Sequence, residues 1–117
     1  MNTIAKQPLI LIGIKLLHTV VWIFIAACVL GIPIASALSR FRVAAALSAV
    51  VLVECLILAA NRCRCPMTDM AAAHTSDRAD NFDIYLPLWL ARYNKLIFGS
   101  LFVTAELFLL FKWVISL

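Results

Sequence analysis

Three long runs of apolar residues dominate the sequence, and more polar segments separate them. The runs cover about 8–30, 41–60 and 96–117. Each has roughly the 20 residues that an α-helix needs to cross the hydrocarbon core of a bilayer. The pattern therefore predicts an all-α integral membrane protein, a bundle of three transmembrane helices that form a single domain over 1–117.

The connection between the second and third runs, 61–95, is far more polar than the runs that flank it. An alanine-rich piece before His74 predicts a brief helix, and Thr68 is a suitable N-cap residue for it. The connection therefore predicts helical structure outside the hydrocarbon core.

Three aromatic residues recur every four positions near the end of this connection: Tyr85, Trp89 and Tyr93. Amphipathic rings followed by basic residues such as Arg92 are typical of segments that lie among lipid headgroups. Pro87 interrupts the segment, which is also too short to span. We predict an interfacial segment anchored by the three rings.

The first apolar run stops at Gly31-Ile32-Pro33, which predicts the end of the first helix. Ala35-Ser36-Ala37 resembles a signal-peptidase site. The run is nevertheless longer than the apolar core of a signal peptide, so we expect it to be a genuine span.

Composition agrees with a membrane location. Hydrophobic residues make up 65% of the chain and charged residues 14%, and the mean hydropathy is +1.04. The net charge of +4 comes from scattered residues that form no stripe, which argues against nucleic acid as a partner. The expected partners are membrane lipid and either other integral membrane subunits or further copies of this chain.

The distribution of basic residues predicts the orientation. One side of the membrane would hold six of them and the other side three, Arg40, Arg42 and Lys112. The excess places the N-terminus and the 61–95 connection on the cytoplasmic side. The six are Lys6, Arg62, Arg64, Arg78, Arg92 and Lys95.

Four polar side chains interrupt the apolar runs: Lys15, His18, Glu54 and Glu106. Ionisable groups within a bilayer are costly unless other polar groups meet them. Lys15 and Glu54 lie at similar depth, as do His18 and Glu106, so we predict an intramembrane polar cluster with a Lys15–Glu54 pair. Such a cluster can fix helix packing, carry protons or a ligand, or bind iron, zinc, copper or haem.

A second candidate site is Cys63-Arg64-Cys65. Two thiolates can clasp a soft ion such as copper, and His74 or Met67 could join them. The spacing is shorter than is usual for structural zinc or for a redox pair, so two interfacial thiols remain the simpler interpretation.

Several of these positions together resemble an uncharacterised family of small bacterial inner-membrane proteins, a domain of unknown function. They are His18, Glu54, Cys65-Pro66-Met67-Thr68 and Tyr85-Leu86-Pro87-Leu88. Members carry a first-helix His, a second-helix Glu, a Cys-Pro-Leu-Thr motif and a loop that ends in Leu-Pro. This chain has Met67 in place of the Leu, an additional Cys63, and only a loose match at Asp83-Ile84-Tyr85. The resemblance implies architecture and no mechanism.

No hydrolytic triad, phosphate loop or nucleotide fingerprint is present, so we expect no catalytic activity of the chain's own. The sequence predicts a small accessory or structural subunit of a larger complex in the bacterial inner membrane. The alternative is a metal- or redox-active protein that uses Cys63, Cys65 and His74, or His18 with Glu54.

Overall fold

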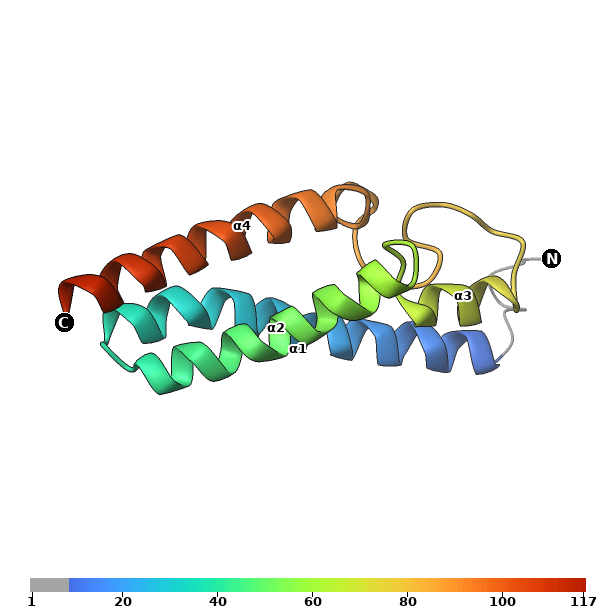
Figure 1. The fold of residues 1–117 in the computed structure, drawn as a ribbon. Coiled ribbons are helices and arrows are strands. Elements are labelled where there is room, and N and C mark those ends of the chain that lie inside the picture. Colours follow the sequence, from blue (N-terminus) through green and yellow to red (C-terminus); the bar gives the residue numbers. More distant parts are fainter. Residues whose placement is uncertain (1–8) are drawn as a thin grey trace. The chain divides into compact units, whose positions relative to one another are not determined.

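The computed structural model describes residues 9–117, and within them every regular element is an α-helix (Figure 1). The all-α class predicted from the apolar runs is confirmed. Pro8 and the preceding tail with Lys6, which entered the predicted first span and the orientation, lie outside the described residues. The helices are α1 (Leu9–Ala37), α2 (Phe41–Ala60), α3 (Pro66–Ala72) and α4 (Leu88–Ile115).

Three of these helices, α1, α2 and α4, are long enough and apolar enough to cross a membrane. Length and composition therefore fit a multi-pass membrane protein. The bounds of α2 match the predicted second span.

The end of α1 differs from the prediction, because the helix runs through Gly31 and Pro33 to Ala37. A proline is tolerated within an apolar helix of this kind where neighbouring groups compensate the lost backbone bond. Ser39, two residues after the end of α1, has a left-handed φ of 58° and prevents the helix from continuing. The N–H groups of Ser39 and Arg40 then bond back to Ser36 and Ala35 at 3.0 and 2.8 Å, the pattern of a Schellman cap.

The start of α4 also differs, because the helix begins at Leu88 and not at 96. Pro87 does not break this segment. It precedes the first turn, where its carbonyl accepts the Ala91 N–H at 3.0 Å. The predicted interfacial segment is therefore divided, with Tyr85 before α4 and Trp89 and Tyr93 on its first turns.

Helix α3 confirms the predicted brief helix but not its cap. Cys65 is the N-cap residue and forms no side-chain capping bond. Pro66, whose fixed φ suits the first helical position, begins the helix. Thr68 therefore lies inside α3, and its hydroxyl is free to bond elsewhere.

Contacts divide the described residues into two compact units. We call residues 9–22 and 57–93 the loop unit, and residues 23–56 and 94–117 the helix unit. The loop unit contains α3 beside the N-terminal part of α1, where Ala71 packs against Leu11 and Ile14 (Figure 1).

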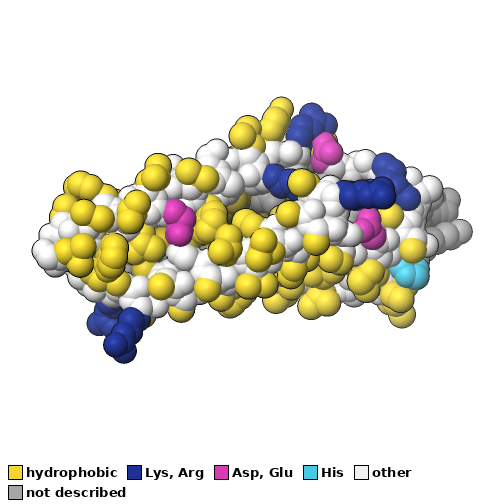
Figure 2. Space-filling model, in the orientation of Figure 1, with side chains coloured by type: hydrophobic (Ala, Val, Ile, Leu, Met, Phe, Trp, Pro, Cys, Tyr) yellow, Lys and Arg dark blue, Asp and Glu magenta, His cyan; other side chains and the backbone are white. Residues whose placement is uncertain are grey.

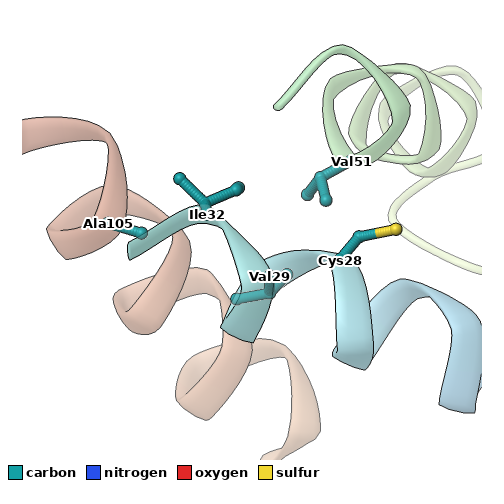
Figure 3. Packing of buried hydrophobic residues seen from close by; sticks show 5 residues of the cluster. All are labelled: Cys28, Val29, Ile32, Val51 and Ala105. Carbon is teal, nitrogen blue, oxygen red and sulfur yellow. The ribbon is translucent and has the colours of Figure 1, made fainter. Parts of the chain in front are cut away.

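The core of the helix unit is small and apolar (Figure 3). Ile32 and Val29 of α1 lie next to Ala105 of α4, and Cys28 lies next to Val51 of α2. Half-buried leucine, valine and phenylalanine side chains surround this cluster: Leu47, Val50, Phe98, Phe102 and Leu109. The three long helices thus share one packed centre.

One glycine permits a close approach within this unit. A Cβ added at Gly31 would lie 3.0 Å from Leu47 Cδ1, whereas a Cβ at Gly13 or Gly99 would meet nothing within 4 Å. We expect Gly31→Val to lower the free energy of unfolding by about 1–3 kcal/mol through overpacking. Gly99→Val, the matched control, should stay near the parent. Thermal melts in one detergent will compare them, and equal midpoints would contradict the close approach.

Candidate functional site

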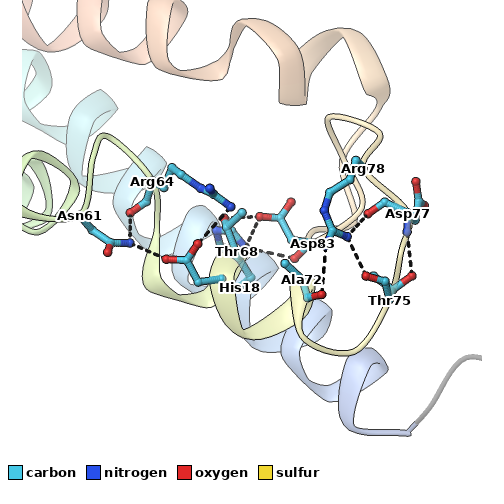
Figure 4. Close-up of polar contacts among 10 residues, drawn as sticks. His18, Asn61, Arg64, Thr68, Ala72, Thr75, Asp77, Arg78 and Asp83 are labelled. Carbon is cyan, nitrogen blue, oxygen red and sulfur yellow. Dashed lines mark hydrogen bonds and ion pairs between the residues drawn. The ribbon is translucent and has the colours of Figure 1, made fainter.

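The best-defined polar site lies in the loop unit, where three segments meet at one carboxylate (Figure 4). Asp83, between α3 and α4, is 6% exposed. Its side chain accepts a hydrogen bond from the Thr68 hydroxyl of α3 and lies 3.5 Å from Nδ1 of His18 on α1. The same Nδ1 is 3.1 Å from the Asp83 backbone carbonyl. The site therefore ties α1, α3 and the following segment together.

The surroundings of His18 define which ring nitrogen carries a proton. Nδ1 faces a carbonyl oxygen and a carboxylate oxygen, and both of these groups accept hydrogen bonds. Nδ1 must therefore carry a proton, which leaves Nε2 of the neutral ring as an acceptor. A backbone carbonyl or carboxylate in this position fixes the tautomer and the orientation of the imidazole.

Apolar neighbours explain why these polar groups are buried. On α1, Leu11, Ile14 and His18 follow the i, i+3, i+7 spacing of one helix face, and the first two pack on Ala71. Asp83 stands between Phe82, which packs against this cluster, and Ile84, which is buried. Because its two neighbours pack against apolar groups, Asp83 is buried with them. Thr68 and His18 provide its polar contacts there.

A second set of contacts ties Tyr85 to α1. The Tyr85 N–H donates to Oγ1 of Thr19 at 3.0 Å, and that hydroxyl donates to the Lys15 carbonyl at 2.7 Å. The Lys15 ammonium lies 4.4 Å from the centre of the Tyr85 ring, within the range of a cation–π contact. The ring nevertheless stays half exposed, as an anchor among headgroups requires.

The turn from α2 to α3 is held by side-chain bonds. Arg62 and Cys63 both adopt left-handed φ angles, 59° and 62°, which are costly for residues other than glycine. Asn61 donates to the Arg64 carbonyl and to Asp69, and Arg64 pairs with Asp69 at 3.0 Å. These bonds offset the unfavourable backbone conformation around the two cysteines.

Arg78 secures the segment after α3. Its guanidinium donates to the carbonyls of Ala72, Thr75 and Asp77 (Figure 4). It also lies 5.2 Å from the Phe82 ring centre. The Ala72 carbonyl is one of the groups that the end of a helix leaves without a partner. Arg78 therefore caps α3 and joins it to the loop that carries Asp83.

The predicted intramembrane cluster is distributed over both units. Lys15 and His18 belong to the loop unit, where they contact Tyr85 and Asp83. Glu54 and Glu106 belong to the helix unit. The cluster of all four residues, and the Lys15–Glu54 pair, stay predictions.

The two glutamates of the helix unit differ from each other. Glu106 accepts a hydrogen bond of 2.6 Å from the Ser48 hydroxyl, which links α4 to α2. Glu54 is half-buried and forms no hydrogen bond or ion pair with any residue of the helix unit. Glu106 is thus satisfied within the helix unit, and Glu54 is not.

The proposed ligands of a three-residue metal site do not assemble in the described part of the chain. No group of three or more His, Cys, Asp or Glu side chains there is close enough to hold an ion. Cys63 and His74 are exposed and flank α3, while Cys65 occupies its N-cap position. A clasp by the two thiolates alone stays a prediction.

The contacts of Asp83 hold segments of the chain together and do not create a nucleophile. In a hydrolytic triad the imidazole stands between the hydroxyl and the carboxylate and removes the hydroxyl proton. Here the carboxylate stands between Thr68 and His18, so the threonine proton is directed to Asp83. The arrangement positions three segments and does not activate Thr68.

Sequence reasoning selected His18 as a site residue but missed Asp83, and it named Thr68 only as an N-cap and as part of the resemblance. The available signal was an acid directly between two apolar residues, Phe82 and Ile84, in an otherwise polar connection. Asn61, Asp69 and Arg78 were missed as well, since nothing in the spacing of surface polar residues distinguishes a tether from a solvated side chain.

Comparison with known proteins yields no relative. No family model matches the chain, and neither a curated protein nor a solved structure is significantly similar to it. What defines its class is therefore the fold itself, whose three long apolar helices fit a multi-pass membrane protein.

Proposed function

We propose that this protein is a small accessory or structural subunit of a larger complex in the bacterial inner membrane. It binds its companions through helix packing and through polar contacts inside the membrane. The N-terminus and the 61–95 connection face the cytoplasm. The observation that carries the proposal is Glu54, a half-buried carboxylate within an apolar helix, which has no hydrogen-bond or ion-pair partner in the helix unit.

The physical argument concerns the cost of that carboxylate. An acidic side chain near the centre of a membrane helix costs about 2.5–3.5 kcal/mol on insertion, and such residues normally face protein or water. A group of this kind is retained more readily where a neighbouring subunit meets it than where it faces acyl chains. Glu54 thus supports a function in assembly.

The outer face of α4 adds support. A shallow groove runs along it, and all the residues that line it are exposed. Gly99, Ser100 and Thr104 are among them, and membrane helices use such small and hydroxylated residues where another helix approaches. The remaining lining residues are Lys95, Leu96 and Val103.

Figure 2 shows that the surface of the molecule is largely apolar on the face that it draws. Hydrophobic side chains cover much of this face, and the acidic side chains toward its right-hand end lie beside basic ones. A surface of this composition suits lipid and other membrane helices as neighbours.

The alternative metal or redox function has less support. His18 is its best candidate ligand, and Nδ1 of that residue already contacts Asp83.

The test is purification from native membranes in mild detergent, followed by native mass spectrometry and an absorption spectrum with metal analysis. We expect the chain to run with one or more companion proteins at a fixed ratio. A monomer without companions would contradict the subunit function. A Soret band, or stoichiometric metal lost in Cys63→Ser or His18→Ala, would replace it with the metal or redox alternative.

A further inference from the structure

One end of the helix unit carries three basic side chains and no acidic one. Arg40 lies in the turn between α1 and α2, Arg42 on the first turn of α2 and Lys112 on the last turn of α4. The turn and the end of α4 belong to the same end of the unit, because α1 and α4 pack together in its core and run in the same direction (Figures 1 and 3). The two acids of the unit, Glu54 and Glu106, lie further along α2 and earlier on α4. This end is therefore positively charged.

These basic side chains are not neutralised within the helix unit. They form no hydrogen bond or ion pair there, and Glu106, six residues before Lys112, bonds to Ser48. The remaining acids of the sequence are four aspartates in the connection between α2 and α4. A chain that crosses the membrane with α2 has this connection and the α1–α2 turn on opposite sides. The negative charge that meets the basic end must therefore come from outside the chain.

The polar connection shows the opposite arrangement. Arg64 pairs with Asp69 at 3.0 Å, Arg92 pairs with Asp80 at 2.8 Å, and Arg78 donates to backbone carbonyls. Figure 2 shows the same contrast, because the basic side chains over the α1–α2 turn gather without an acidic side chain beside them. The charges at the turn are thus available to a ligand.

Apolar surface surrounds this basic end. Leu38 and Val43, which lie close to the two arginines in sequence, are 65% and 47% exposed. Trp113, next to Lys112, is 48% exposed, and a tryptophan at the end of a span is typical of the headgroup level. A ligand that suits this end must therefore combine a negative charge with apolar chains, which a water-soluble anion does not do.

We propose that the end formed by Arg40, Arg42 and Lys112 binds the phosphate of an anionic phospholipid. Phosphate oxygens accept charge-assisted hydrogen bonds from arginine and lysine, and a guanidinium donates two of them at once. Clusters of basic residues at the end of a membrane helix attract anionic lipids in this way. The inference goes beyond the subunit function and does not rest on it, because phospholipid is present in both leaflets.

The test measures quenching of tryptophan fluorescence by brominated lipids. Trp22→Phe and Trp89→Phe leave Trp113 as the single tryptophan of the full chain, beside Lys112. The protein is reconstituted in phosphatidylcholine vesicles with a minor fraction of phosphatidylglycerol, and one or the other lipid carries the bromine. We expect phosphatidylglycerol to bind next to Trp113 about tenfold more strongly than phosphatidylcholine.

Substitutions then locate the preference. Arg40→Gln with Arg42→Gln should remove most of it, and Lys112→Gln should remove a part. The matched control is Arg64→Gln with Arg92→Gln, which changes the net charge equally but affects arginines that already pair with aspartates. Arg40→Lys with Arg42→Lys preserves the charge and should keep the preference, and circular dichroism verifies that the helices are intact.

Three outcomes would overturn the lipid site. They are equal quenching by the two brominated lipids, equal losses in the two double glutamine variants, and relief of the quenching by inorganic phosphate, which would identify a site for soluble anions. Purification without companion proteins would overturn the subunit function alone and leave these measurements unchanged.

Discussion

Replacing His18 by alanine is expected to lower the free energy of unfolding of the loop unit by about 2–3 kcal/mol. The change removes the donor that faces both the carbonyl and the carboxylate of Asp83, and it leaves that buried acid with Thr68 as its remaining side-chain partner. It also opens a void beside the apolar contact between α1 and α3. The large effect follows because one side chain serves three segments.

The measurement is hydrogen exchange by mass spectrometry in detergent, combined with thermal melts. We expect amides of α3 and of residues 73–87 to exchange faster in His18→Ala, while the core of the helix unit around Val51 keeps its protection. The matched control is His74→Ala, because His74 is exposed and lies in the same unit. Asp83→Ala should also loosen this region, since it removes the carboxylate oxygen that both Thr68 and His18 contact.

Two results would count against this account of the site. If His18→Ala and His74→Ala exchanged alike, the contact with Asp83 would have no structural weight. If His18→Ala altered an absorption band or a metal content without changing exchange, the imidazole would act as a ligand and not as a tether.

The fold was largely predictable because helix length and apolar composition are local properties. The run at 41–60 begins and ends at the residues that bound α2, since polar residues flank it on both sides. The end of α1 was not predictable in the same way. Sequence rules look for glycine or proline at a helix end, whereas this helix passes both and ends in a Schellman cap at Ser39.

The candidate site was predictable only in part, for a related reason. The first apolar run identified His18 as a site residue, because an ionisable group within a membrane helix needs a polar partner. It could not identify Asp83 as the partner, since 65 residues separate the two and no helical spacing relates them. The contact depends on how the connection after α3 returns to α1, which Phe82 and Arg78 determine through packing and capping.

Ile32 offers the second large effect, in the helix unit. Its side chain is fully buried, at 0% exposure, between residues of α1, α2 and α4. Ile32→Ala should lower the free energy of unfolding by about 2–4 kcal/mol, because the removed atoms leave a cavity that the surrounding helices fill only partly. The matched control is Ile34→Ala, two residues along the same helix, where the side chain is 62% exposed.

The comparison of the two isoleucines tests where the packed centre lies. In a membrane the hydrophobic effect gives little reason to bury an isoleucine against protein, because lipid is equally apolar, so packing contacts dominate helix association. Lipid or detergent can fill the space left at Ile34 but not the space left at Ile32. Thermal melts, and unfolding of the isolated chain in mixed micelles, should therefore show a large loss of stability for Ile32→Ala and little change for Ile34→Ala. Equal losses would mean that Ile34 also contacts protein, and a reversed order would place the packed face of α1 on its other side.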